Sequence, residues 1–188
     1  MVVYLLWRAY RRLDALNAEM AQLAHDLENA NEELAAVLTE VGGSRIVIEL
    51  TEPMAKVLQT LGIQRGMVVS GSVGNQRMDE LSTLGENVIA EFYQDRGFST
   101  ATLDPTDLPL SKATLEDLAG GDAETNADLI RAILNGEDQG PKREAVLMNT
   151  GAALFVASAA DSISAGMDLA GAVIDDGRAA TKLAALAK

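Results

Sequence analysis

Hydrophobic residues recur at alternating spacings of three and four along the first 41 positions of the chain. The series is Leu13, Leu16, Met20, Leu23, Leu27, Ala30, Leu34, Val37 and Val41. An a/d pattern held for about four heptads predicts one long helix with a coiled-coil seam. Gly42 and Gly43 predict its end. We therefore expect residues 1–43 to be a separate helical segment, in which residues 13–41 either join copies of the chain or pack within one copy.

The period of the pattern changes after the two glycines. Residues 45–50 are short and rich in β-branched side chains, which predicts a strand. Thr51 is then expected to cap a helix that ends at Gly62, and residues 66–69 form a second short strand. Strand, helix and strand in so short a run indicate a βαβ unit with parallel pairing.

The next two segments, 87–94 and 98–103, alternate in polarity and are separated by Asp95-Arg96-Gly97, so they predict a β-hairpin. Helices are expected at residues 114–118, 122–136, 141–160, 162–175 and 178–187. We expect Asp122 to act as an N-cap and Asn149 to be a hydrogen-bonded core amide. The stretch 145–160 carries almost no charge, which predicts a helix buried on all faces, with small residues that allow close packing.

These elements predict an α/β fold. It has a partial parallel sheet with a β-hairpin and flanking helices in residues 44–188, preceded by the long N-terminal helix.

Composition removes several classes of function. The 188 residues include 15 basic and 28 acidic ones, a formal net charge of -13, which argues against nucleic acid or an anionic membrane as partner. There is no cysteine, which excludes thiol catalysis, disulfides and cysteine-bound zinc. The one histidine, His25, is expected to be an exposed helix residue. No apolar run reaches the roughly 18 residues of a spanning helix, and we expect a cytoplasmic protein.

Two adjacent carboxylates, Asp79 and Glu80, form the candidate site. They follow the second predicted strand and a glycine-bearing loop. Ligands of open α/β sheets bind beyond the carboxyl ends of strands, and Mg²⁺ uses one or two carboxylates together with waters and substrate phosphates. The alternative for a bare pair is solvated surface charge. The loop 71–74 lacks the Lys-Ser/Thr of a phosphate loop and is not expected to be one.

An ordered series of motifs beginning near Met67 resembles the C-terminal part of anthranilate phosphoribosyltransferases. The series comprises Met78–Ser82, Thr102–Pro105, Leu115–Asp122, Ile130–Leu134, Gly140-Pro141 and Ala145–Asn149. The resemblance covers about two-thirds of the chain, and extends more loosely over residues 45–62. It implies a pentosyl-transferring glycosyltransferase of tryptophan biosynthesis.

The resemblance also implies substrates and metal ligands. The family transfers the phosphoribosyl group of phosphoribosyl pyrophosphate to anthranilate with the help of Mg²⁺. The resemblance implies two Mg²⁺ ions, one of which is held by the acidic pair, here Asp79 and Glu80. No further catalytic residue is carried over, and Mg²⁺ is the only cofactor that the resemblance implies.

The sequence also departs from the family pattern. The motifs Gly-Thr-Gly-Gly-Asp, Asn-x-Ser-Thr and Lys-His-Gly-Asn do not occur in it. Because positioning of the phosphates supplies much of such catalysis, we do not expect turnover by this chain alone. Two alternatives stay open: a non-catalytic, oligomerising fragment, and a nucleoside phosphorylase-like enzyme of the same architecture. Whether a partner chain completes the site is open too.

Overall fold

The computed structural model describes Gln22 and residues 44–186. The chain divides into two compact units between Ile46 and Val47, and the account below concerns the second unit. The heptad series at residues 13–41 and His25 lie outside the described residues. The coiled coil and the domain boundary at residue 43 therefore stay predictions.

The first described helix, α2, spans Ser44–Thr60. The predicted strand at residues 45–50 is therefore wrong, and so is the prediction that Thr51 caps a helix. Thr51 lies inside α2 and is 3% exposed. A short apolar run does not distinguish a strand from a helix, and the spacing of Val47, Leu50, Met54 and Val57 continues a helical stripe through both predicted elements.

The strands form one sheet in the order β2-β1-β3-β4. Their bounds are β1 Arg65–Val73, β2 Gln76–Met78, β3 Asn87–Tyr93 and β4 Gly97–Leu103. Every pair is antiparallel, so the predicted βαβ unit and its parallel pairing are wrong. The cause is that residues 45–50 belong to α2, so no strand before β1 is available among the described residues for parallel pairing. Gly74, with a φ of 56°, instead turns β1 back onto β2.

The α/β class with a β-hairpin and flanking helices is confirmed. The hairpin joins β3 to β4 through Gly97, which has a φ of 96°. The remaining elements are the short 3-10 helix η1 Pro105–Asp107 and the helices α3 Leu115–Leu118, α4 Ala123–Leu134, α5 Pro141–Val156, α6 Ile163–Asp175 and α7 Arg178–Leu186. The Asp122 cap is confirmed, since its carboxylate accepts a hydrogen bond from the Thr125 amide at 2.8 Å.

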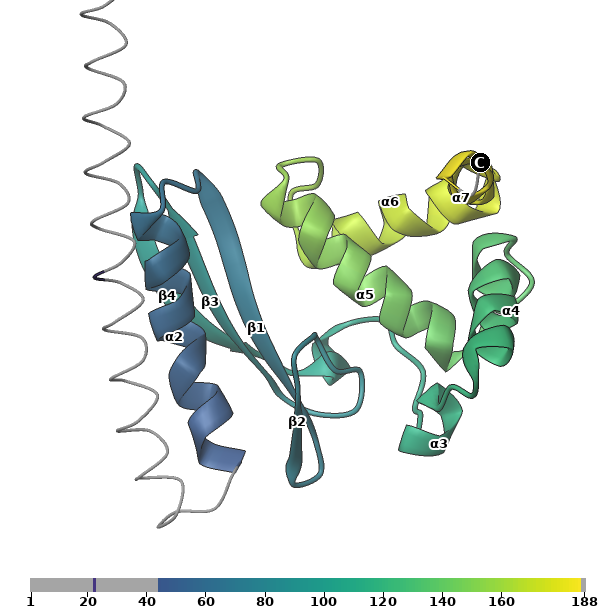
Figure 1. Cartoon of the computed structure of the whole chain (residues 1–188), viewed down its shortest axis with the longest axis horizontal. Helices are drawn as coiled ribbons and strands as arrows, with labels where there is room; N and C mark the ends of the chain where they lie inside the picture. Colours follow the sequence, from purple (N-terminus) through teal and green to yellow (C-terminus); the bar gives the residue numbers. More distant parts are fainter. Residues whose placement is uncertain (1–21, 23–43, 187–188) are drawn as a thin grey trace, which may run out of the picture. The chain divides into compact units, whose positions relative to one another are not determined.

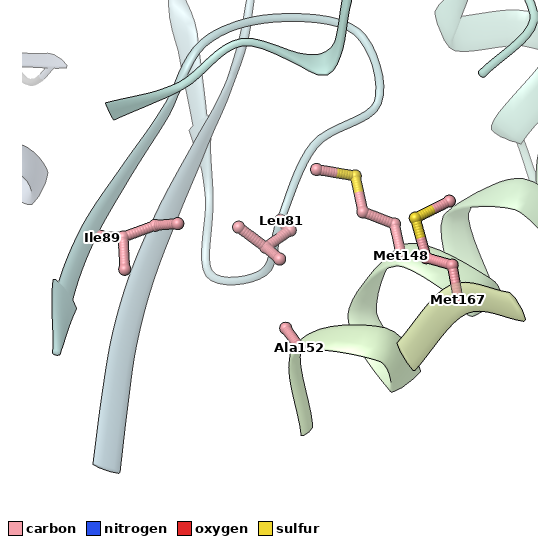
Figure 2. Packing of buried hydrophobic residues seen from close by; sticks show 5 residues of the cluster. All are labelled: Leu81, Ile89, Met148, Ala152 and Met167. Carbon is pink, nitrogen blue, oxygen red and sulfur yellow. The ribbon is translucent and has the colours of Figure 1, made fainter. Parts of the chain in front are cut away.

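Helices cover the two faces of the sheet in different ways (Figure 1). Against α2, the buried cluster is Ala55, Ala90 and Phe92, with Val68 and Phe98 packed around it. On the opposite face, Figure 2 shows Leu81 lying between Ile89 of β3 and Met148 of α5. Ala152 and Met167 complete this second cluster. The alternation of side chains along each strand accounts for the two clusters.

Helices α5 and α6 cross where both carry glycine. A Cβ on Gly151 would lie 2.7 Å from the Ile163 carbonyl oxygen, so the prediction of close packing through small residues is confirmed. The prediction that the helix is buried on all faces is wrong, because Val146 is 37% exposed and Ala153 is exposed. Within residues 44–186 and Gln22, no helix has the length and apolar character needed to cross a membrane.

Candidate functional site

Asp79 and Glu80 begin the loop that joins β2 to β3, and both residues are exposed. The pair was predicted to follow the second strand of a βαβ unit. In the structure it follows β2, a short strand that pairs antiparallel with β1. The next residue, Leu81, is only 2% exposed and belongs to the core cluster in Figure 2. Burial of Leu81 anchors the loop, while the two carboxylates stay in solvent.

Two asparagine side chains fix the backbone of this loop. Asn87 accepts a hydrogen bond from the Ser82 amide at 2.6 Å and donates to the Ser82 carbonyl oxygen at 3.0 Å. Asn149, on α5, accepts from the Leu81 amide at 2.9 Å and donates to the Leu81 carbonyl oxygen at 3.0 Å. The prediction of a satisfied core amide at Asn149 is confirmed. Sequence reasoning missed Asn87, whose only signal was an asparagine at the start of a strand.

The loop also lies directly against β1. The Gly71 amide donates to the Glu80 carbonyl oxygen at 3.0 Å. A Cβ on Gly71 would lie 2.6 Å from the Ser82 amide nitrogen, so a larger residue would push the loop away. Residues 71–74 run through β1 into its turn with no helix after them, which agrees with the prediction that they are not a phosphate loop.

The donor set of the loop fits Mg²⁺ better than it fits a larger cation. Among residues 44–186 and Gln22, no group of three or more His, Cys, Asp or Glu side chains could hold a metal. The carbonyl oxygens of Glu80 and Leu81 already accept hydrogen bonds. The carboxylates of Asp79 and Glu80 are exposed and so are open to an ion from solvent. Mg²⁺ is held by one or two carboxylates with water or phosphate, whereas Ca²⁺ takes six to eight oxygens.

A pocket of about 560 Å³ adjoins the acidic pair, and sequence reasoning gave no sign of it. Glu80 and Ser82 line it on the loop side, and mostly apolar side chains of α3, α4 and α5 line the opposite side, together with Asn126 and Lys142. Its rim carries Leu115 and Ile130, which are 56% and 50% exposed. The one lysine in its lining, Lys142, donates to the Asp117 carbonyl oxygen at 2.6 Å.

Two carboxylates near this pocket, Asp117 and Asp122, have lowered pKa values because of hydrogen bonds at helix starts. The pKa of Asp117 is held below its ordinary value, first by the hydrogen bond from the Thr114 amide and then by the one from its hydroxyl. The bond from the Thr114 amide is one half of the capping box of α3, and the other half is the bond from the Asp117 amide to the Thr114 hydroxyl. The pKa of Asp122 is lowered in the same way by the Thr125 amide and hydroxyl at the start of α4. Both lowered pKa values therefore result from helix capping.

Comparison with known proteins identifies the family of this domain. The sequence model described as "Glycosyl transferase family, a/b domain" matches residues 46–180. The anthranilate phosphoribosyltransferase of Lacticaseibacillus paracasei is 46% identical over 134 residues, which are 71% of this chain and 38% of that protein. The Alkaliphilus metalliredigens protein of the same name is 45% identical over 139 residues, 74% of this chain and 40% of that one. The predicted resemblance is confirmed over this part of the chain.

Solved structures agree with this relationship. The anthranilate phosphoribosyltransferase of Thermus thermophilus has a TM-score of 0.61 at 39% identity, covering 71% of this chain and 37% of that one. A Saccharomyces cerevisiae anthranilate phosphoribosyltransferase variant with Mg bound has a TM-score of 0.61 at 26% identity, covering 72% and 38%. The chain thus spans about two fifths of the length of these relatives.

Proposed function

Because this chain belongs to the glycosyl transferase family through its α/β domain, we propose that it supplies the metal-holding part of an anthranilate phosphoribosyltransferase site. The reaction would move the phosphoribosyl group of phosphoribosyl pyrophosphate to the amine of anthranilate, a step of tryptophan biosynthesis. The names of the relatives support this substrate pair. The observation that carries the proposal is the fixed loop with two exposed carboxylates at Asp79 and Glu80.

Asp79 and Glu80 are the residues that would hold Mg²⁺. A bound cation neutralises negative charge on a departing pyrophosphate, which lowers the barrier to transfer. The related yeast variant with Mg bound supports a metal in this family. The donor set of the loop, two carboxylates with room for water or phosphate oxygens, suits the same ion.

The surroundings of the pair supply positioning. Asn87 on β3 and Asn149 on α5 both bond to the loop backbone, and the buried side chain of Leu81 anchors the loop in the core. The two carboxylates therefore start from a fixed backbone and need little reorganisation to hold an ion. Such prior ordering removes part of the entropic cost of assembling a reactive geometry.

Metal binding tests the proposal directly. The full chain is titrated with Mn²⁺, which replaces Mg²⁺ as an electron paramagnetic resonance probe, with and without phosphoribosyl pyrophosphate. We expect Asp79→Asn to weaken Mn²⁺ binding at least about tenfold, which corresponds to 1.4 kcal/mol. The matched control is Asp95→Asn, which removes an exposed carboxylate in the turn between β3 and β4. Equal affinity of the two variants would refute the site.

Turnover is measured separately, through the fluorescence of anthranilate with phosphoribosyl pyrophosphate and Mg²⁺ present. We expect the chain alone to show none, because the sequence lacks the glycine-rich motif for pyrophosphate. Turnover that Asp79→Ala abolishes would refute the expectation of inactivity and would support the metal site.

A further inference from the structure

Large apolar side chains are exposed on the helices that lie beside the acidic loop. Leu115 of α3, Ile130 of α4 and Leu183 of α7 are 56%, 50% and 36% exposed. Val146 of α5 and Leu186 of α7 are 37% and 74% exposed. Helix α4, which carries Ile130, lies between α3 and α7 (Figure 1). These five residues are called the apolar strip below.

The apolar strip is continuous because Ile130 lines two pockets. One is the pocket of about 560 Å³ beside Glu80, which Leu115 and Val146 also line. The other pocket, of about 410 Å³, lies between α4 and α7 and includes Leu183 in its lining. An exposed apolar surface that joins two hollows marks an interaction site, whereas single exposed apolar residues do not.

Acidic residues accompany the apolar strip. Residues 115–134, which include α3 and α4, contain five acidic residues and one basic residue. The basic residue, Arg131, already pairs with Asp128 at 2.7 Å. Among the described residues, no ion pair includes Glu80 or Glu124. The strip therefore suits an apolar partner that carries positive charge.

Residues 1–12, which lie outside the described residues, have this chemistry. They include three arginines and no acidic residue, although the whole chain has a formal net charge of -13. Within the helix predicted for residues 1–41, four apolar residues of this segment share one face: Val3, Leu6, Trp7 and Tyr10. Their spacing of i, i+3, i+4 and i+7 is the one by which a helix binds an apolar groove. Arg11 follows Trp7 by one turn and borders this face.

The length of the predicted helix favours contact between copies of the chain. At about 1.5 Å per residue, an unbroken helix places residues 1–12 about 48–65 Å from Ser44. A domain of about 140 residues has a radius of gyration of about 15 Å, so it is about 40 Å across. Residues 1–12 are therefore better placed to reach the apolar strip of another copy.

We propose that residues 1–12 of one copy dock as an amphipathic helix on the apolar strip of a second copy. Their apolar face would lie along Leu115, Ile130 and Leu183, and their arginines would face the acidic residues of α3 and α4. Tryptophan and arginine suit this contact, because these residue types supply much of the binding energy of protein interfaces. The contact needs no Mg²⁺ and no substrate, so it is independent of the proposed metal site.

The emission of Trp7 tests the contact, because Trp7 is the only tryptophan of the chain. The full chain is diluted stepwise without Mg²⁺ or substrates, while tryptophan emission and sedimentation are followed. We expect blue-shifted emission in the associated copies and the emission of a solvent-exposed indole once the copies separate. Emission that stays blue-shifted in the monomer would place Trp7 against its own copy and would overturn the proposal.

Substitutions in the apolar strip make the test specific. Ile130→Glu places a carboxylate at the junction of the two pockets and should raise the concentration at which the emission shifts at least about tenfold. The matched control is Met54→Glu, since Met54 is 52% exposed on α2 and lines none of the pockets found among the described residues. Leu115→Glu repeats the change on α3 and decides the question if Ile130→Glu unfolds α4. Emission of the strip variants equal to that of Met54→Glu would overturn the proposal.

Mixing two variants shows whether the contact joins separate copies. The Ile130→Glu chain keeps Trp7 but lacks an intact strip, so its tryptophan should be exposed when this variant is alone. The Trp7→Ala chain keeps the strip and contributes no tryptophan signal. An excess of Trp7→Ala should shift the emission of the Ile130→Glu chain to the blue. No shift on mixing would overturn the proposal.

Vesicles of phosphatidylserine and phosphatidylcholine test the other class of partner, because basic amphipathic helices also bind anionic lipid surfaces. We expect the blue-shifted emission of the associated chain to form without vesicles. Emission of an exposed indole at every protein concentration, with a blue shift only on the vesicles, would overturn the proposal and assign residues 1–12 to a lipid surface.

Discussion

The two faces of the sheet are completed to different degrees. On the α2 side, Ala55, Ala90 and Phe92 are each 0% exposed, and a Cβ on Gly66 would lie 2.5 Å from the Phe92 ring. On the α5 side, Leu81 closes only the end of the face near the acidic loop, and a pocket remains between β1 and α5. The described residues therefore bury a cluster completely on the α2 side, the closed face, whereas the α5 side, the open face, keeps room beside the candidate site.

The largest loss of stability should come from removing a large buried side chain from the closed face, the α2 side of the sheet. Phe92→Ala is expected to lower the free energy of unfolding by about 4 kcal/mol, because it leaves a cavity among fully buried neighbours. Met67→Ala is the matched change on the open face, where the side chain is only half-buried beside the pocket. Its cost should be about 1 kcal/mol, since less apolar surface is buried to begin with.

Urea unfolding of both variants measures this difference. Similar losses of stability would mean that the two faces are equally well packed and would contradict the comparison. A larger loss of unfolding free energy for Met67→Ala than for Phe92→Ala would mean that the open face is the better packed of the two.

The features that could be predicted from sequence are those determined locally. The cap at Asp122, the turn at Gly97 and the start of α5 at Pro141 each depend on a few neighbouring residues, and each is confirmed. Asn149 could be predicted because an amide within an apolar helix needs partners inside the protein.

The features that could not be predicted depend on distant partners. The run at residues 45–50 is compatible with strand or helix, and only its surroundings decide between them. Strand pairing across Gly74 depended on a turn conformation that the sequence pattern did not resolve. The second anchor of the acidic loop, Asn87, could not be found because its hydrogen bonds reach as far as Leu103.

A smaller effect is expected from the loop that closes the second face. Asn87 is 0% exposed, and Asn87→Ala would leave the buried backbone of Ser82 without its partners. We expect a loss of about 3 kcal/mol, the upper end of the cost of unsatisfied buried groups. Mn²⁺ affinity should fall with it, because the backbone that carries Asp79 and Glu80 would no longer be fixed.

Asn126 provides the matched control for this loop. Its side chain makes the same paired contact with a peptide group, accepting from the Gly121 amide at 2.8 Å and donating to the Gly121 carbonyl oxygen at 3.0 Å. This contact is exposed, so Asn126→Ala should cost at most about 1 kcal/mol. Equal effects in urea unfolding would show that burial of the Asn87 amide has no special importance for the loop.

The smallest effect on stability is expected at Arg65, which links β1 to α5 beside the pocket on the open face. Arg65→Lys retains the positive charge but loses the planar group that contacts Tyr93, Phe155 and Glu91 together. The expected loss is about 1 kcal/mol, whereas Arg131→Lys, in an ion pair with Asp128 whose side chains are 61% and 72% exposed, should cost close to nothing. If the arginine matters through spacing, Arg65→Lys should also speed amide exchange at the end of α5. Unchanged exchange there would mean that the pocket keeps its shape without the arginine, and that the openness of this face is a property of the strand and helix backbones alone.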